Sequence, residues 1–106
     1  MRPLLHISPT AAPFYDMMSQ IAFGKDGVPK EYENQIKDLV NSTLEHLHDT
    51  IGIINFWSNI PEVSKLKGAL SDLMLLCGIN EIEDVAEKLV TEITSLAKVR
   101  HQEIIA

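Results

Sequence analysis

The chain has little of what small secreted domains and metalloproteins depend on. Cys77 is the single cysteine among 106 residues, so neither an internal disulfide nor a cysteine-rich metal site can form. No apolar run approaches the roughly 20 residues that a membrane-spanning helix needs, and residues 1–5 lack the apolar core of a signal peptide. These absences predict a cytoplasmic protein that has no contact with a membrane.

Basic residues are also scarce. Nine lysines and arginines stand against 15 acidic residues, and the resulting net charge of -6 repels the phosphates of nucleic acids. Small basic clusters do occur, at Lys65 with Lys67 and at Lys98 with Arg100. The simpler interpretation is a solvated helix face, since lysine and arginine commonly occupy exposed helix positions. The alternative is a weak contact with phosphates, which requires the two clusters to converge on one face.

Groups for catalysis or metal binding are missing as well. His46 and His48 lie two residues apart, which on a helix directs them to different sides and prevents joint chelation of one ion. Cys77 falls on an apolar stripe just before a glycine, a position typical of a buried structural thiol. No phosphate loop, zinc motif, nucleophile elbow or dinucleotide fingerprint is present. The sequence therefore predicts no catalytic, cofactor-binding or metal-ligating residue.

Apolar residues at helical spacing are what the sequence does contain. Residues 1–9 are expected to form an extended arm. Thr10 is then the predicted N-cap of a first helix, which carries Pro13 in its first turn and stops at Gly24. A second, long helix is predicted over residues 30–50, and Gly52 is expected to end it by adopting a positive φ.

The second half of the chain predicts two more helices. Pro61 suits the first position of a third helix, with Asn59 just upstream and Gly78 at its end. Asn80 and Glu83 have the spacing of a capping box at the start of a fourth helix, whose apolar period continues weakly beyond residue 100. Short connections favour antiparallel neighbours. We predict an all-α fold with no sheet, in which residues 1–106 form one compact bundle of about four helices.

Four of the six aromatic residues lie in two adjacent pairs. Phe56 and Trp57 lie side by side in the connection between the second and third helices, and Phe14 and Tyr15 lie in the first helix. The simpler interpretation is that these rings close the core, as aromatic residues in small domains usually do. The alternative is a docking surface, because tryptophan and tyrosine are enriched among the residues that dominate interfaces. Phe56, Trp57 and Tyr15 are therefore the candidate partner contacts.

Several segments resemble the C-terminal helical region of type I restriction enzyme R subunits. They are PFYD at 13–16, AFGK at 22–25, TIGIINFW at 50–57 with Pro61 soon after, LKG at 66–68, AEKLV at 86–90 and LAKVRHQE at 96–103. The resemblance extends over nearly the whole chain, and its motifs are helical and hydrophobic.

The resemblance implies that the chain is a fragment of a much larger ATP-driven DNA translocase and endonuclease. The nuclease, phosphate-loop and helicase motifs of that family lie upstream of this region, so no catalytic residue carries over. For this region the resemblance implies a docking role that holds the motor subunit against the methyltransferase and specificity subunits. DNA would then be met only through the assembled complex.

Two alternatives remain open without the resemblance. Four amphipathic helices and an acidic surface also fit an independent small protein that self-associates, such as a regulatory or antitoxin-like dimer. A small enzyme is the least favoured interpretation, because the sequence shows no set of convergent polar groups around a pocket.

Overall fold

The computed structural model describes residues 8–105, so most of the extended arm predicted for residues 1–9 lies outside the described residues. Within them every regular element is helical, which confirms the all-α prediction of about four main helices without a sheet. The elements in chain order are α1 (Ala12–Phe23), η1 (Gly24–Asp26), η2 (Lys30–Tyr32), α2 (Glu33–Ile51), η3 (Phe56–Ser58), α3 (Ile60–Leu75), α4 (Asn80–Glu83), α5 (Ala86–Val99) and α6 (His101–Ile105).

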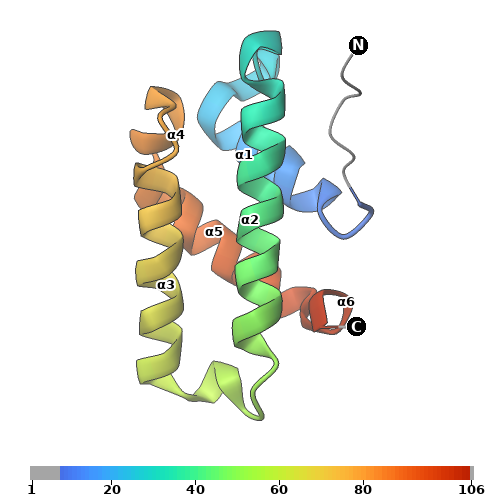
Figure 1. Cartoon of the computed structure of the whole chain (residues 1–106), viewed down its shortest axis with the longest axis vertical. Helices are drawn as coiled ribbons and strands as arrows, with labels where there is room; N and C mark the ends of the chain where they lie inside the picture. Colours follow the sequence, from blue (N-terminus) through green and yellow to red (C-terminus); the bar gives the residue numbers. More distant parts are fainter. Residues whose placement is uncertain (1–7, 106) are drawn as a thin grey trace.

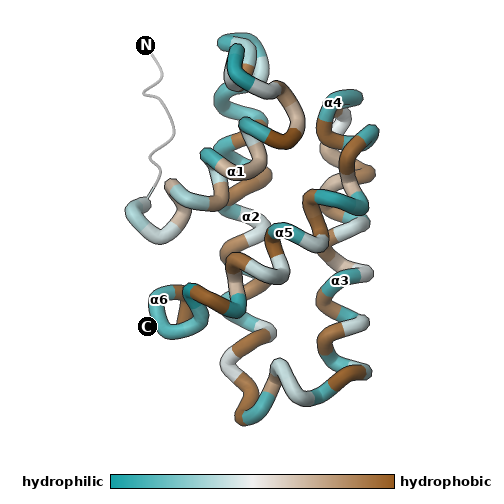
Figure 2. Tube along the Cα trace, turned by 180° about the vertical axis from the view of Figure 1, so that it is seen from behind, coloured by the Kyte–Doolittle hydropathy of each residue, from teal (hydrophilic) through white to brown (hydrophobic). Residues whose placement is uncertain are grey.

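The two longest helices, α2 and α3, stand side by side and run in opposite directions (Figure 1). Helix α5 crosses behind both of them, and α1 lies beside the upper part of α2; the view from behind shows α5 in front (Figure 2). The α2–α3 pair therefore has α1 and α5 packed on one face. The other face carries no helix from residues 8–105.

One cluster of buried side chains holds these helices together. Each main helix contributes buried residues spaced three or four apart, which places them on a single stripe. Helix α2 contributes Ile36, Leu39, Val40, Leu47 and Ile51, and α5 contributes Ala86, Leu89, Val90, Ile93 and Ala97. Burying such apolar area is the main favourable term in folding, at about 25 cal/mol per Å².

Two threonines lie within this apolar core. The hydroxyl of Thr43 donates to the carbonyl oxygen of Leu39 at 2.8 Å, and that of Thr94 donates to the carbonyl oxygen of Val90 at 2.7 Å. Each bond reaches back four residues along its own helix, so the buried hydroxyls are satisfied without a partner from elsewhere in the fold.

The predicted helix starts are confirmed in part. Pro13 and Pro61 both lie in the first turns of their helices, where a missing N–H is tolerated. Asn59 caps α3, since its side-chain oxygen accepts the backbone N–H of Glu62 at 3.4 Å. The prediction of Thr10 as the cap of α1 is wrong.

The residue that precedes α1 is Ala11, which has no side chain able to cap. Its backbone N–H instead donates to the hydroxyl oxygen of Ser8 at 3.2 Å and to the carbonyl oxygen of Ser8 at 3.0 Å. The backbone N–H of Ala12, the first residue of α1, also donates to the carbonyl oxygen of Ser8 at 3.0 Å. The turn before the helix, rather than a side-chain cap, therefore satisfies this N–H.

The connection between α2 and α3 turns differently from the prediction. Gly52 has a φ of -70°, so the expected positive φ at this glycine is wrong. The left-handed residue is Asn55, with a φ of 59°. Asparagine tolerates this region better than most residues do, because its short polar side chain can bond locally.

The predicted fourth helix is three helices. The helix is interrupted after Glu83 and again at Arg100, and these two interruptions separate α4, α5 and α6. Asn80 is the first residue of α4 rather than its cap, and the cap position belongs to Ile79, so the predicted capping box is wrong. The apolar period continued through both breaks in the sequence because all three helices bury residues in the same core.

Candidate functional site

Phe56 and Trp57, which we call the aromatic joint, both pack against the rest of the fold. Phe56 is 1% exposed and belongs to the core, while Trp57 is half-buried against it. The two rings meet edge to face with centroids 5.0 Å apart, a favourable aromatic arrangement. The indole N–H of Trp57 also donates to Nδ1 of His101 in α6, at 3.0 Å. The joint thus ties the α2–α3 connection to the last helix.

The exposed surface beside this joint is formed by isoleucines that the sequence analysis did not single out. Ile54 is 88% exposed and Ile60 is 69% exposed, and both line one shallow depression of about 470 Å³ with Asn55, Ser58, Asn59 and Pro61. Ile53, next in the chain, is also exposed. We call Ile53, Ile54 and Ile60 the isoleucine cluster. These isoleucines flank Phe56 and Trp57 in the sequence, but only the aromatic residues were predicted to contact a partner.

The third aromatic candidate, Tyr15, does not join the aromatic joint. Helix α1, which carries it, lies beside the upper part of α2, away from the α2–α3 connection (Figure 1). Its side chain is half-buried and packs against the core. Burial raises the pKa of Tyr15, and the nearby carboxylates of Glu33 and Asp16 raise it further. The raised pKa keeps the phenol of Tyr15 neutral to a higher pH than usual.

The four basic candidates do not form one patch. Lys65 and Lys67 are exposed on α3, but a spacing of two residues points them to different sides of the helix. Lys65 pairs with Glu62 at 3.4 Å. In the second cluster Arg100 pairs with Glu103 at 2.9 Å, and Lys98 is exposed at the end of α5. Two of the four charges are therefore already engaged by carboxylates.

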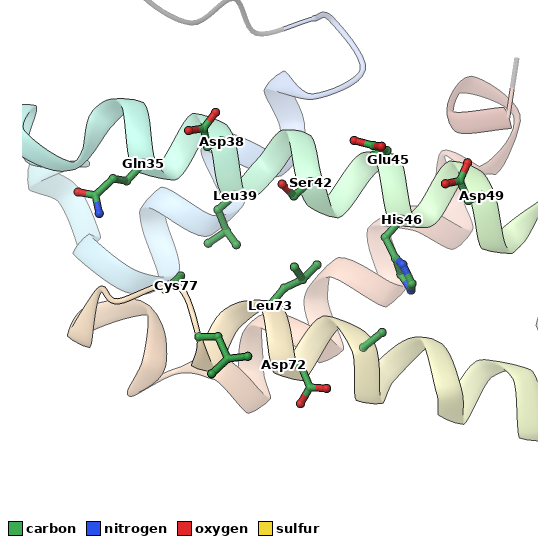
Figure 3. A pocket seen from close by; sticks show the side chains of 12 residues that line it. Gln35, Asp38, Leu39, Ser42, Glu45, His46, Asp49, Asp72, Leu73 and Cys77 are labelled. Carbon is green, nitrogen blue, oxygen red and sulfur yellow. The ribbon is translucent and has the colours of Figure 1, made fainter.

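A larger hollow lies on the face of α2 and α3 that α1 and α5 leave open (Figure 3). It is a groove of about 740 Å³ between the two helices. Its apolar lining consists of Leu39 from α2 and of Ala69, Leu73 and Leu76 from α3 and the residue after it. Leu76 is 84% exposed, a large apolar side chain left in water at one end of the groove. We call this hollow the α2–α3 groove.

The polar lining of the α2–α3 groove is acidic. Asp38, Glu45 and Asp49 line it from α2 and Asp72 lines it from α3, all with exposed side chains. None of the lining residues within the described part of the chain is a lysine or an arginine. His46 also lines it and points toward α3 (Figure 3). The groove therefore combines an apolar floor with a negative rim.

Sequence reasoning missed this groove for a physical reason. Each carboxylate, taken alone, resembles an ordinary solvated helix position, and only the approach of α2 to α3 places them around a common hollow. A weak signal was available, because Asp38, Glu45 and Asp49 are spaced seven and four apart and so share one stripe of α2.

Chemistry-bearing groups do not converge in the described part of the chain. Among residues 8–105 no three histidine, cysteine, aspartate or glutamate side chains are placed to hold a metal ion. The thiol of Cys77 donates to the carbonyl oxygen of Met74 at 3.1 Å, and burial raises the pKa of Cys77. A raised pKa disfavours the thiolate, which is the nucleophilic form of cysteine. The helices of the described residues also include none with the length and apolar character to cross a bilayer.

The chain matches no family model, no curated protein and no solved structure.

Proposed function

We propose that this chain is a non-catalytic docking module of a larger assembly. The isoleucine cluster is the observation that carries the proposal. Single exposed apolar residues are common, but Ile54 and Ile60 lie around the same depression, with Ile53 beside it. Covering the cluster with a partner would remove this apolar surface from water. The rigid joint formed by Phe56 and Trp57 would hold it in place for binding.

The setting we propose is the motor subunit of a type I restriction enzyme in the cytoplasm. The sequence resemblance supports this setting, and it implies the methyltransferase and specificity subunits as partners. The parent protein would then be an ATP-dependent translocase and site-specific endonuclease, with this region contributing no catalytic group. DNA would be reached through the complex, which agrees with a chain of net charge -6.

A pull-down with the methyltransferase and specificity subunits of the same organism tests the proposal. The intact chain should be retained, and Ile54→Asp or Ile60→Asp should weaken retention about tenfold or more, because a carboxylate would replace a buried apolar contact. Val99→Asp is the matched control, since Val99 is 82% exposed at the end of α5 and lines neither this depression nor the α2–α3 groove. Failure of the intact chain to bind, or equal loss with all three variants, would contradict the proposal.

The same cluster could instead join two copies of the chain, which is the self-associating alternative. Sedimentation of the intact chain distinguishes the two. A concentration-dependent dimer that Ile54→Asp dissociates would favour the small self-associating protein. A monomer that still binds the subunits would favour the docking module.

A further inference from the structure

We propose that the α2–α3 groove binds a basic amphipathic helix of a partner protein. This surface is separate from the isoleucine cluster, so the inference does not depend on the restriction-enzyme setting. It follows from the shape, the length and the charge of the groove.

The shape favours a helix. Two neighbouring helices leave between them a trough into which the side-chain ridge of a third helix fits, and grooves of this kind receive amphipathic helices through apolar residues at every third or fourth position. Here the floor offers Leu39 and Leu73, and the exposed Leu76 extends the apolar surface at one end. Helices α1 and α5 cover only the other face of the pair, so among residues 8–105 no third helix completes a packed layer on this face (Figure 1).

The length sets the size of the occupant. The lining residues of α2 extend from Gln35 to Asp49, which at about 1.5 Å per residue is roughly 21 Å, and those on the α3 side extend from Ala69 to Cys77, roughly 12 Å. A partner helix of about four turns would span the longer wall. A compact small molecule would fill only part of it.

The charge selects the occupant. Asp38, Glu45 and Asp72 take part in none of the ion pairs within residues 8–105, and Asp49 has only the exposed ring of His48 beside it at 3.4 Å. Lysine or arginine side chains flanking the apolar stripe of a partner helix would meet these carboxylates from both sides. Such complementary rims speed association and fix the register of a helix in its groove.

The same charges argue against other occupants. Two copies docked groove to groove would bring the carboxylates of Asp38, Glu45 and Asp72 against the same set in the partner copy. A nucleic acid would bring phosphates to a negative rim to which residues 8–105 contribute no lysine or arginine. A basic amphipathic helix is the macromolecular ligand that complements both the apolar floor and the acidic rim of the groove.

A synthetic helical peptide of about 16 residues tests the inference, with leucines at every third or fourth position and lysines on either side of that stripe. Its affinity for the intact chain is measured by titration calorimetry at low salt and at moderate salt. We expect saturable one-to-one binding that weakens as salt rises. Two comparison peptides separate the contributions: in one, glutamates replace the lysines, and in the other, alanines replace the leucines. Both should bind at least about tenfold more weakly.

A charge exchange on the protein gives the decisive result. The double variant Asp38→Lys and Glu45→Lys should lose affinity for the lysine peptide by about tenfold and gain affinity for the glutamate peptide. Both residues are exposed, so the fold should persist, which circular dichroism checks. Ile54→Asp is the matched control and should bind the lysine peptide as the intact chain does.

Three results would overturn the inference. Equal binding of the leucine and alanine peptides would mean a general attraction of cations to an acidic protein. Loss of peptide binding in Ile54→Asp but not in the charge-exchanged variant would move the site to the isoleucine cluster. A dimer in sedimentation that Leu76→Asp dissociates would make a second copy the occupant.

Discussion

Asn59 and Asn80 both lie at the starts of helices, but of these two residues Asn59 alone makes a capping hydrogen bond. Asn59 accepts the N–H of Glu62, whereas Asn80 lies inside the first turn of α4. Asn59→Ala should therefore lower the free energy of unfolding by about 0.5–1 kcal/mol, at the low end for a cap because the 3.4 Å bond is long. Asn80→Ala should change it little. Urea unfolding of both variants checks this, and an equal or larger loss in Asn80→Ala would contradict it.

The thiol of Cys77 predicts a dependence of stability on pH. Burial raises its pKa in the folded state, so folding favours the protonated thiol. The protonated thiol therefore contributes to the free energy of unfolding. This contribution is fully present below the ordinary thiol pKa of about 8.5 and is lost as pH rises through the higher folded-state pKa. The intact chain should therefore lose stability relative to Cys77→Ala as pH rises above about 8.5. Urea unfolding of both proteins across this range measures it, and a difference that stays constant with pH would refute it.

At the scale of the helix, replacing each of two glycines by alanine should change the stability of the protein in opposite directions. Gly68 lies within α3, and a Cβ there meets nothing within 4 Å, so Gly68→Ala should stabilise the protein by roughly 0.5–1 kcal/mol. Gly78 follows α3 with a φ of 80°, and Gly78→Ala should destabilise it by about 1 kcal/mol or more. Thermal unfolding of both variants is the measurement. Stabilisation by both alanines would show that the turn after α3 can relax.

The helical elements also show what a sequence can predict. Local apolar spacing identified the long helices α2 and α3, because each keeps one stripe in the core along its whole length. The same criterion could not detect the breaks at residues 84–85 and at Arg100, since the segments on both sides of each break face the same core. The left-handed conformation of Asn55 was not predicted, because glycine adopts a positive φ most easily and Gly52 lies nearby.

The candidate surfaces were less predictable than the helices. The isoleucine cluster is contiguous enough in sequence to be noticed, but whether Ile54 or Phe56 faces water depends on how the joint turns. The α2–α3 groove depends on two helices whose facing residues are far apart in sequence. Periodicity tells which side of a helix is apolar, and it does not tell which helix will lie beside it.

At the scale of the whole molecule, the bond between Trp57 and His101 joins residues 44 positions apart. It holds the α2–α3 connection to the C-terminal helix and predicts energetic coupling between them. In a double-mutant cycle of Trp57→Phe and His101→Phe, we expect a coupling energy of about 0.5–1.5 kcal/mol. Urea unfolding of the two single variants and the double variant measures it. Additive losses would mean that the hydrogen bond contributes nothing to stability.

Trp57 is also the only tryptophan in the chain, which gives the molecule a built-in optical reporter. Its indole rests on Phe56 and donates to His101, so its emission should change when α6 leaves its place. Short terminal helices often open before the core does. Intrinsic fluorescence can therefore time the release of the chain end, while circular dichroism follows the loss of helix in the rest of the protein.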